Sequence, residues 1–463
     1  MVVQHNMQAA NANRMLNITT GAQSKSTEKL SSGYRINRAA DDAAGLSISE
    51  KMRKQIRGLD KASSNAEDGV SSVQTAEGAL TEVHSMLQRM NELAVQAANG
   101  TNSDTDRGAI QDEISQLTTE IDRVAETTKF NETYLLKGGN GTKDVYMNGH
   151  DAGLKGTLTD SATTATFKVA AGALDAGKSV TIGGKDYTIG STLDETKALA
   201  TAAKAATNTS FTVDDTKYNV DAAGKITKDG DATAKDVAVD DIVKTGSKVS
   251  YDGKTLTAAD IDAATGVDKS DSSVISAAHA VDLMEKELTA ANNIGATKTA
   301  ATAKKAAAYT SKDGVTFDIK KGTAEVADKL SFSLHVGSDA DMTNKITVDI
   351  ETMNSSYLGI KGLNVNDDSG IAGTYAIDAI SDALQKVSEQ RSSLGAVQNR
   401  LEHTIDNLDN VVENTTSAES RIRDTDMAEE MVNYSKNNIL AQAGQSMLAQ
   451  ANQSNQGVLS LLQ

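Results

Sequence analysis

LDKASSNAEDGVSSVQTAEGALTEVHSMLQRMNELAVQA, residues 59–97, is the stretch that decides the fold. Apolar or small side chains recur in it every seven residues, along two rows that lie three residues apart. The first row is Leu59, Ala66, Val73, Leu80, Leu87 and Ala94, and the companion row is Ala62, Gly69, Ala76, Val83, Met90 and Ala97. These rows predict one long helix over Ser47–Ala98. Because the stripe runs along the whole helix, it needs partner helices of similar length.

Two later segments carry matching stripes. A shorter helix is predicted from Ile110, Ile114, Leu117, Ile121 and Val124. A second long helix is predicted from Ile380, Val387, Leu394, Leu401 and Leu408, with Ile377, Leu384, Ile405 and Val412 on its companion row. Arg391 and Gln398 interrupt that companion row, which is typical of register control or of a rim position.

The two ends of the chain resemble each other. Arg14 is the only charged residue from Met1 to Ser24, and Asn437–Gln463 has none. Both ends show helical periodicity, which predicts amphipathic helices with neutral polar faces. A charge-free surface suits a homopolymer, because every charge there would meet copies of itself. The residues expected to make polymerisation contacts are Met427, Tyr434, Leu448, Leu459 and Leu462.

The middle of the chain, about residues 138–329, is rich in Gly, Thr, Asp, Lys and Ala. Alternating residues around Gly183-Gly184 predict a β-hairpin, and the pattern recurs over 211–220 and, more faintly, over 249–258. Ala-rich helices are predicted between the hairpins, at 193–206 and 274–291. Another hairpin is predicted just after this insert, from residues 330–336 and 345–350.

The predicted architecture is mainly α: a long helical coiled-coil rod built from both chain ends with a β-hairpin, plus an inserted α+β variable domain. Residues 1–42 and 423–463 are assigned to terminal helices that are disordered in the monomer, since isolated helices are marginal in water. Residues 43–137 and 330–422 are assigned to the rod, and residues 138–329 to a surface-exposed insert.

Composition excludes several classes of function. Lys+Arg 46 against Asp+Glu 63 gives a net charge of −17, which argues against a nucleic-acid binder. The absence of Cys excludes disulfides and thiolate metal sites. No stretch has the length of a membrane span, and the first 13 residues lack the basic and apolar regions of a secretory signal peptide. The absence of Pro suits a chain that must unfold and refold quickly.

No catalytic, metal or cofactor site is predicted. The six His residues are scattered without an H-E-x-x-H motif or a pair at ligand spacing. The Gly-rich run 138–141 lacks the Lys-Ser/Thr of a phosphate loop and indicates a turn. Carboxylate pairs at 41–42 and 429–430 lie beside predicted helices, where dipole complementation or a solvated face explains them better than acid–base catalysis.

Several long motifs, in the right order, resemble the signatures of bacterial flagellin. At the amino end they are LSSGYRIN (30–37), DDAAGL (41–46), LQRMNELAVQ (87–96) and IQDEI (110–114). At the carboxyl end they are LGAVQNRL (394–401), SRIRDTDMA (420–428) and LAQANQ (448–453). The resemblance covers about residues 1–137 and 330–463, and the insert matches no family that we can name.

The resemblance implies a structural subunit that polymerises into the flagellar filament for motility. It implies paired terminal helices lining a channel, a rod in the tube wall and an insert that projects outward. It also implies an extracellular location in the flagellum, reached through a flagellar type III apparatus without a cleaved signal peptide. The implied partners are further copies of the chain, cap and hook-associated proteins, and an export chaperone at the C-terminal helix.

Flagellins are also recognised by Toll-like receptor 5 of a host, and the resemblance implies a matching surface on the rod. The matching residues are Leu87, Gln88, Arg89, Glu92, Leu93, Gln96, Ile110 and Glu113. Helical spacing lets Arg89, Leu93 and Gln96 share a face, so Arg89 is expected to act as an anchor beside Leu93. The alternative is that these residues serve subunit packing. Asn91 departs from the family, whose receptor-binding members usually have a second Arg there.

Two other functions stay open from the sequence. A flagellin-like hook–filament junction protein is one, although the closing residues 456–462 and the motif at 421–424 look like flagellin itself. The other is a filament that displays a glycan-binding or enzymatic insert. A zincin-type protease insert would need the H-E-x-x-H motif that the chain lacks.

Overall fold

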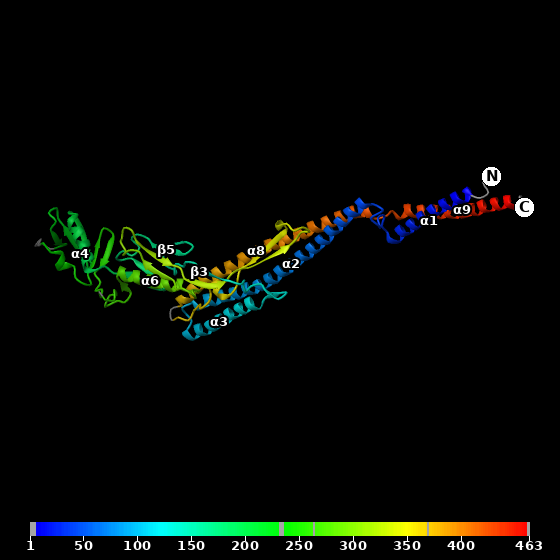
Figure 1. The fold of residues 1–463 in the computed structure, drawn as a ribbon. Helices are drawn as coiled ribbons and strands as arrows, with labels where there is room; N and C mark the ends of the chain where they lie inside the picture. The colour runs from blue at the N-terminus through cyan, green and yellow to red at the C-terminus, as the bar shows by residue number, and fades with distance from the viewer. Residues whose placement is uncertain (1–5, 231–235, 263, 368–369, 461–463) are drawn as a thin grey trace. The chain divides into compact units, whose positions relative to one another are not determined.

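A computed structural model describes residues 6–230, 236–262, 264–367 and 370–460 of the chain (Figure 1). It divides into two compact units. The first comprises Met1–Ser71, Ser333–Val348 and Ala396–Gln463, and the second Ser72–Phe332 and Asp349–Gly395. Two long helices, α2 (Ala43–Ala97) and α8 (Ile371–Arg423), contribute residues to both units.

The first unit contains the terminal helices α1 (Met7–Ser32) and α9 (Met427–Ser460), which lie side by side (Figure 1). It also holds a small core between α2 and α8, where Leu59 and Ala62 pack against Leu408. Farther along α2, Ala66 packs with Leu401 and with Ile346 of a β-hairpin. That hairpin consists of β17 (Leu330–His335), the 3-10 turn η1 (Met342–Asn344) and β18 (Lys345–Ile350).

Glycine in α2 allows the hairpin to approach the helix closely. A Cβ atom at Gly69 would overlap the Leu334 side chain and would lie 3.3 Å from Cδ1 of Leu401. At Gly58, a Cβ would lie 3.0 Å from Cβ of Ser338. Gly69 belongs to the companion row of the sequence, so that row is a docking groove for the hairpin as well as a helix seam.

In the second unit, α2 lies against α3 (Asp104–Thr127) and the first part of α8. The two predicted rows are buried here: Val73, Ala76, Leu80, Val83, Leu87, Met90, Ala94 and Ala97 have no exposed area. Ile114 and Ile121 of α3 and Ile380 and Val387 of α8 are buried too. The guanidinium of Arg391, which interrupts the sequence pattern, lies 2.9 Å from Oε1 of Glu77, so that position is an ion pair at the helix rim.

The sheets of the second unit are mostly antiparallel hairpins. The largest has the order β10-β9-β8-β11-β12, and two others are β14-β15-β5-β4 and β13-β7-β6. Their strands are β4 (Thr157–Asp160), β5 (Thr164–Val169), β6 (Ser179–Ile182), β7 (Lys185–Ile189), β8 (Thr209–Val213), β9 (Thr216–Val220), β10 (Ile226–Lys228), β11 (Lys248–Tyr251), β12 (Lys254–Thr257), β13 (Val274–Ile275), β14 (Thr302–Lys305) and β15 (Val315–Lys320). The two-stranded pairs are β1 (Lys129–Phe130) with β2 (Thr133–Tyr134), and β3 (Thr142–Tyr146) with β16 (Thr323–Ala327).

Four shorter helices complete this unit: α4 (Leu193–Ala205), α5 (Val239–Ile242), α6 (Ala277–Asn292) and α7 (Ser355–Leu358). The main core of the insert lies between α6 and the sheets that contain β5, β15 and β7. Two residues of α8 join this core: Ile371 packs against it and Tyr375 is buried in it. The Tyr375 hydroxyl donates a 2.5 Å hydrogen bond to Glu287 of α6. The insert is therefore built partly on residues of the rod helix.

The predicted fold class is confirmed, and so are most of its elements. The hairpin at Gly183-Gly184 forms with Val180 opposite Tyr187, and both glycines have positive φ, 57° and 66°. The predicted helix at 274–291 is wrong at its start. Val274–Ile275 instead forms β13, parallel to β7, and Ser276 caps α6 by accepting a hydrogen bond from the backbone of His279. Extended β-branched residues and a Ser cap outweigh the Ala-rich pattern at this point.

None of the helices in the described part of the chain is long and apolar enough to cross a membrane.

Candidate functional site

The paired terminal helices form the first candidate site. Within α9, the predicted row turns toward α1: Ala441 is buried, and Tyr434 and Leu448 are half-buried. A Cβ at Gly444 would lie 3.4 Å from Cδ1 of Leu16, which shows how closely the two helices approach. Met427, at the start of α9, is 49% exposed.

Polar contacts tie the two ends of this helix pair. The Asn6 side chain accepts a hydrogen bond from the backbone of Ala9 and donates one of 3.2 Å to the carbonyl of Ala451. Nearer the other end of α1, Lys29 lies 3.7 Å from Glu430. Of the remaining predicted polymerisation residues, the Leu459 side chain and Leu462 lie outside the described part of the structure.

Besides Met427, the large apolar side chains that stay uncovered on these helices were not among the predicted ones. They are Met431, Val432, Ile439, Leu440 and Met447 on α9, and Met7, Met15 and Ile18 on α1. A groove of about 610 Å³ between the helices is lined by Ala12, Met15, Gly444, Met447 and neutral amides. The sequence signal that finds these residues is a second heptad pair, Val432–Ile439, beside Leu440–Met447. Of the row chosen from sequence, Tyr434 and Leu448 therefore lie in the seam inside one chain, whereas Met427 is exposed.

Next to the helix pair, contacts of Tyr34 and Arg35 join the segment between α1 and α2 to the end of α8. The centre of the Tyr34 ring lies 4.9 Å from the guanidinium of Arg423 and 5.6 Å from that of Arg53. Arg423 also binds Glu50 at 2.7 Å, and this hydrogen bond lowers the pKa of the Glu50 carboxyl. The backbone of Arg35 donates to the carbonyl of Arg423 at 2.7 Å. The segment that follows α1 is thus bound to the end of α8, just before α9 begins.

The predicted receptor surface centres on Arg89 of α2. Its Nε donates to Glu113 of α3 at 2.9 Å, and Nη1 lies 3.2 Å from Glu92. The hydrogen bond with Glu113 is the main cause of a raised pKa for Arg89. About half of the Arg89 side chain is exposed. The guanidinium therefore lies across two helices with both carboxylate partners at the surface.

The structure corrects the expectation that all eight predicted residues share one accessible face. Gln88, Arg89, Glu92, Gln96 and Glu113 are exposed. Leu87, Leu93 and Ile110 are buried, with exposed fractions of 0%, 2% and 6%. The reason is that Leu87 lies on the heptad row, and the stripe it belongs to is occupied by neighbouring helices. In the described structure Leu93 supports the surface from beneath instead of flanking Arg89 on it.

A buried arginine that was not predicted from the sequence lies where α2 ends and α3 and α8 begin. Arg107 of α3 is 3% exposed, and its Nε donates to the carbonyl of Ala97 at 3.1 Å. A second guanidinium nitrogen approaches the carbonyl of Asn99 at 3.5 Å, and the third lies 3.6 Å from Asp104. Arg107 thus caps the carboxyl end of α2, where carbonyls lack helical partners.

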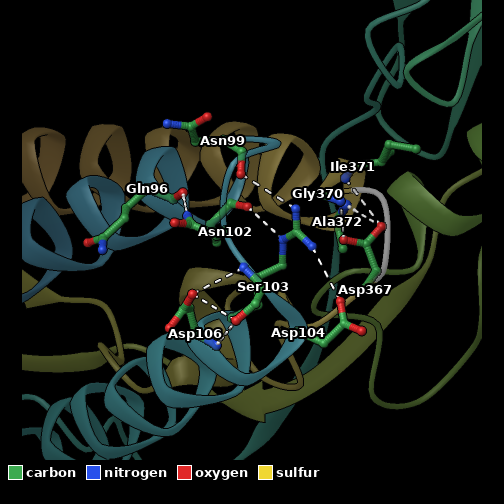
Figure 2. A network of polar contacts seen from close by, with 12 residues as sticks. Gln96, Asn99, Asn102, Ser103, Asp104, Asp106, Asp367, Gly370, Ile371 and Ala372 are labelled. Carbon is green, nitrogen blue, oxygen red and sulfur yellow. Dashed lines mark hydrogen bonds and ion pairs between the residues drawn. The ribbon is translucent and has the colours of Figure 1, made fainter.

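Side-chain caps hold the two helices that start beside Arg107 (Figure 2). Ser103 and Asp106 form a reciprocal capping box at the start of α3. Asp367 accepts hydrogen bonds from the backbone of Gly370 and Ile371 at the start of α8. No local sequence pattern identifies Arg107 as buried, because the acceptors that it reaches at the end of α2 are backbone carbonyls.

Among the described residues no group of three or more His, Asp and Glu side chains is placed to hold a metal ion.

Comparison with known proteins gives the family. The model of the bacterial flagellin N-terminal helical region matches residues 3–141, and that of the C-terminal helical region matches residues 377–462. A flagellin of Clostridium tyrobutyricum is 40% identical over 98% of this chain and all of its own length. A flagellin of Bacillus subtilis is 36% identical, with both chains fully covered. A solved structure of FliC from Burkholderia pseudomallei aligns with 72% of this chain and 99% of its own, at 21% identity and a TM-score of 0.27.

Proposed function

Since this chain belongs to the bacterial flagellin family, and is a structural subunit of the flagellar filament, we propose that the uncovered apolar face of its terminal helices is the surface through which copies assemble. The observation that carries the proposal is the exposure of six large apolar side chains on α9, among them Ile439 at 67% and Leu440 at 47%. Exposed apolar patches of this kind mark association sites. Because this face lacks ionised groups over Asn437–Gln463, identical copies can approach without charge repulsion.

Seeded polymerisation tests this proposal. The double variant I439Q/L440Q should raise the critical monomer concentration at least about tenfold, because burying one such side chain contributes ~1.5–3 kcal/mol. The matched control is Q442A/Q445A, which alters exposed polar positions of the same helix and should polymerise normally. Removal of residues 437–463 should abolish filaments while the rod stays folded. Filaments of I439Q/L440Q at the unaltered critical concentration would contradict the proposal.

We also propose the domain assignment made from the sequence, with residues 1–42 and 423–463 as the filament core that is disordered before assembly. The rod would comprise 43–137 and 330–422, and the insert 138–329. Support comes from α2 beginning at Ala43 and α8 ending at Arg423. Replacing residues 140–328 by a Gly/Ser linker should preserve the tubes, with lower stability because Ile371 and Tyr375 lose their cover. Circular dichroism that shows an unfolded rod would refute the modular assignment.

The same apolar face suggests how the chain is handled before assembly. A surface of this kind has to be kept from premature association, so we propose that an export chaperone covers α9. We propose further that the chain leaves through the flagellar type III apparatus and is extracellular, with cap and hook-associated proteins as neighbours in the flagellum. Pull-down with purified α9 variants tests the chaperone contact: I439Q/L440Q should lose it and Q442A/Q445A should keep it.

A second proposed function is recognition of the monomer by Toll-like receptor 5 at the Arg89 surface. The supporting observation is the half-exposed Arg89 guanidinium, held across α2 and α3 by Glu113 and Glu92. An arginine with its geometry already fixed gives up less side-chain freedom on binding and is a common interface anchor. Leu87, Leu93 and Ile110 would contribute by fixing the backbone beneath it.

Binding of the monomer to the receptor ectodomain tests this function. R89A should weaken binding by ~1–2 kcal/mol or more if Arg89 is an anchor of ordinary size. The control is R123A, which removes another exposed arginine of the rod that pairs with the adjacent Glu120. Exposed ion pairs contribute little to folding stability, so both variants should stay folded. Equal affinities of the two variants would refute the assignment.

A further inference from the structure

One face of the insert carries a composition that the filament function does not use. In β5 the side chains of Phe167 and Val169 are buried, so that Thr164, Thr166 and Lys168 point to the opposite side. The burial alternates in the same way in β15, and in β4 and β14 the single inward residues are the half-buried Leu158 and the buried Ala303. We call the outward set the threonine–lysine face. It comprises Thr157, Thr159, Thr164, Thr166, Lys168, Thr302, Lys304, Thr316, Asp318 and Lys320.

The polar groups of this face have no partners among the described residues. Lys168, Lys304 and Lys320 make no ion pair there, even though Asp318 lies directly across from Lys304 in the strand register. Their sequence neighbours behave differently: Lys305 binds Asp282 at 2.6 Å and Lys321 binds Asp160 at 2.8 Å. The fold thus pairs one lysine of each adjacent couple and leaves the other on the face.

The five-stranded sheet of the insert provides an internal comparison. Its lysines are unpaired too among the described residues, but several of its hydroxyl and amide side chains are hydrogen-bonded to neighbouring side chains. Ser250 and Thr255 are 2.8 Å apart, and Asn219 donates to Asp229 at 2.9 Å. The six threonine hydroxyls of the threonine–lysine face make no such side-chain bonds within the described structure. They are therefore free to bind another molecule.

The strand register sets the spacing of the backbone positions that carry the three lysines. Lys304 and Lys320 lie on neighbouring strands, offset by two residues, and Lys168 lies on the strand beyond. With strands ~4.8 Å apart and ~3.4 Å per residue, the three backbone positions are about 8, 12 and 14 Å apart. Three lysines and Asp318 give the face a net charge of 3 − 1 = +2. The Debye length in physiological salt is ~8 Å, so a polyanion on this face responds to this local charge more than to acidic residues elsewhere in the chain.

We propose that the threonine–lysine face binds an anionic polysaccharide, one that carries sulfate or carboxylate groups among hydroxyls. Ammonium groups complement the charges, and free threonine hydroxyls can donate to and accept from sugar hydroxyls. The face has no aromatic ring or Arg for stacking nucleic-acid bases. It has no apolar side chain to enter a lipid surface or to form the core of a protein interface.

Retention of the full-length monomer on immobilised heparin tests the proposal. The triple variant K168T/K304T/K320T should bind about 10- to 100-fold more weakly at low salt, the effect expected from removing three surface cations. The control K217T/K228T/K248T removes three exposed lysines from the five-stranded sheet and should bind like the unaltered chain. Equal weakening by both triple variants would overturn the proposal, and so would failure of the unaltered chain to bind heparin.

A second arm separates sugar recognition from charge alone. T159V/T166V removes two cross-strand hydroxyls, keeps every charge and keeps β-branched side chains in the strands. It should weaken heparin binding severalfold and leave thermal unfolding unchanged. Single-stranded DNA should bind more weakly than heparin at the same salt concentration. Unaltered affinity of T159V/T166V, or DNA binding as tight as heparin binding, would refute a polysaccharide site.

Discussion

The rod helix α2 and the terminal helix α9 carry the same kind of heptad pattern but bury it differently. On α2 the rows from Val73 to Ala97 are enclosed by α3 and α8. On α9 the partner α1 covers only the row that contains Ala441, while Ile439 and Leu440 stay exposed. Within one chain, α2 therefore buries both of its rows, whereas α9 leaves a large apolar face exposed, as the proposed assembly surface requires.

The largest expected effect comes from cutting the same side chain back in both regions. L80A removes a fully buried leucine of α2 and should lower the free energy of unfolding by ~2–5 kcal/mol. L440A removes a leucine of α9 that is 47% exposed and should leave monomer unfolding nearly unchanged while raising the critical concentration for assembly. Denaturant unfolding of the monomer checks both. Similar losses of monomer stability would break the contrast between the helices.

A smaller effect is expected from two glycines of α2. At Gly69 a methyl group would overlap Leu334, so G69A should lower stability by ~1–3 kcal/mol through overpacking. At Gly78 nothing lies within 4 Å of the new Cβ, so G78A should raise stability by up to ~1 kcal/mol through helix propensity. Opposite shifts in thermal unfolding are expected. A stabilising G69A would show that the hairpin does not depend on this groove.

The smallest effect concerns the cap of α3. S103A should lower stability by ~1 kcal/mol, because the Ser103 side chain caps the helix. Hydrogen bonds from Ser103 also lower the pKa of Asp106 below its ordinary value of 3.8. The stabilisation from the ionised Asp106 carboxylate is therefore present above that pH and disappears as the pH falls through the folded-state pKa. S103A should therefore weaken the acid dependence of unfolding.

The control for that experiment is S276A, which removes the N-cap of α6, where His279 occupies the position that Asp106 holds in α3. It should lower stability by a similar amount without changing the dependence on pH below about 4, since no carboxylate belongs to this cap. Equal acid dependence of the two variants would show that Asp106 is not the group responsible.

The sequence was informative wherever a long period repeats. Leu59 to Ala97 could be assigned to a buried seam because six successive heptads agree, and the hairpin at Gly183-Gly184 because its glycines require positive φ. The parallel strand β13 could not be found, since two residues carry no period. Arg107 could not be placed because it binds backbone carbonyls, whose positions depend on the ends of three helices.

The candidate surfaces show the same limit. Heptad spacing identified the row of α9 that contains Tyr434 and Leu448, but not that α1 occupies it. Family motifs placed Leu93 and Arg89 together, whereas burial separates their roles. Periodicity shows which side chains share a helix face. It does not show whether the partner for that face belongs to the same chain.

The sharing of Tyr375 and Ile371 between α8 and the insert core bears on the use of this chain as a display scaffold. If a foreign domain replaced residues 140–328, Ile371 and the Tyr375 ring would lose their apolar cover. The Tyr375 hydroxyl would also lose its native acceptor, Glu287. A chimera that copies only the boundaries of the insert would therefore leave an exposed apolar patch at the beginning of α8. Either of two changes would remove that patch: retaining α6 with the graft, or replacing residues 371 and 375 by polar helix formers.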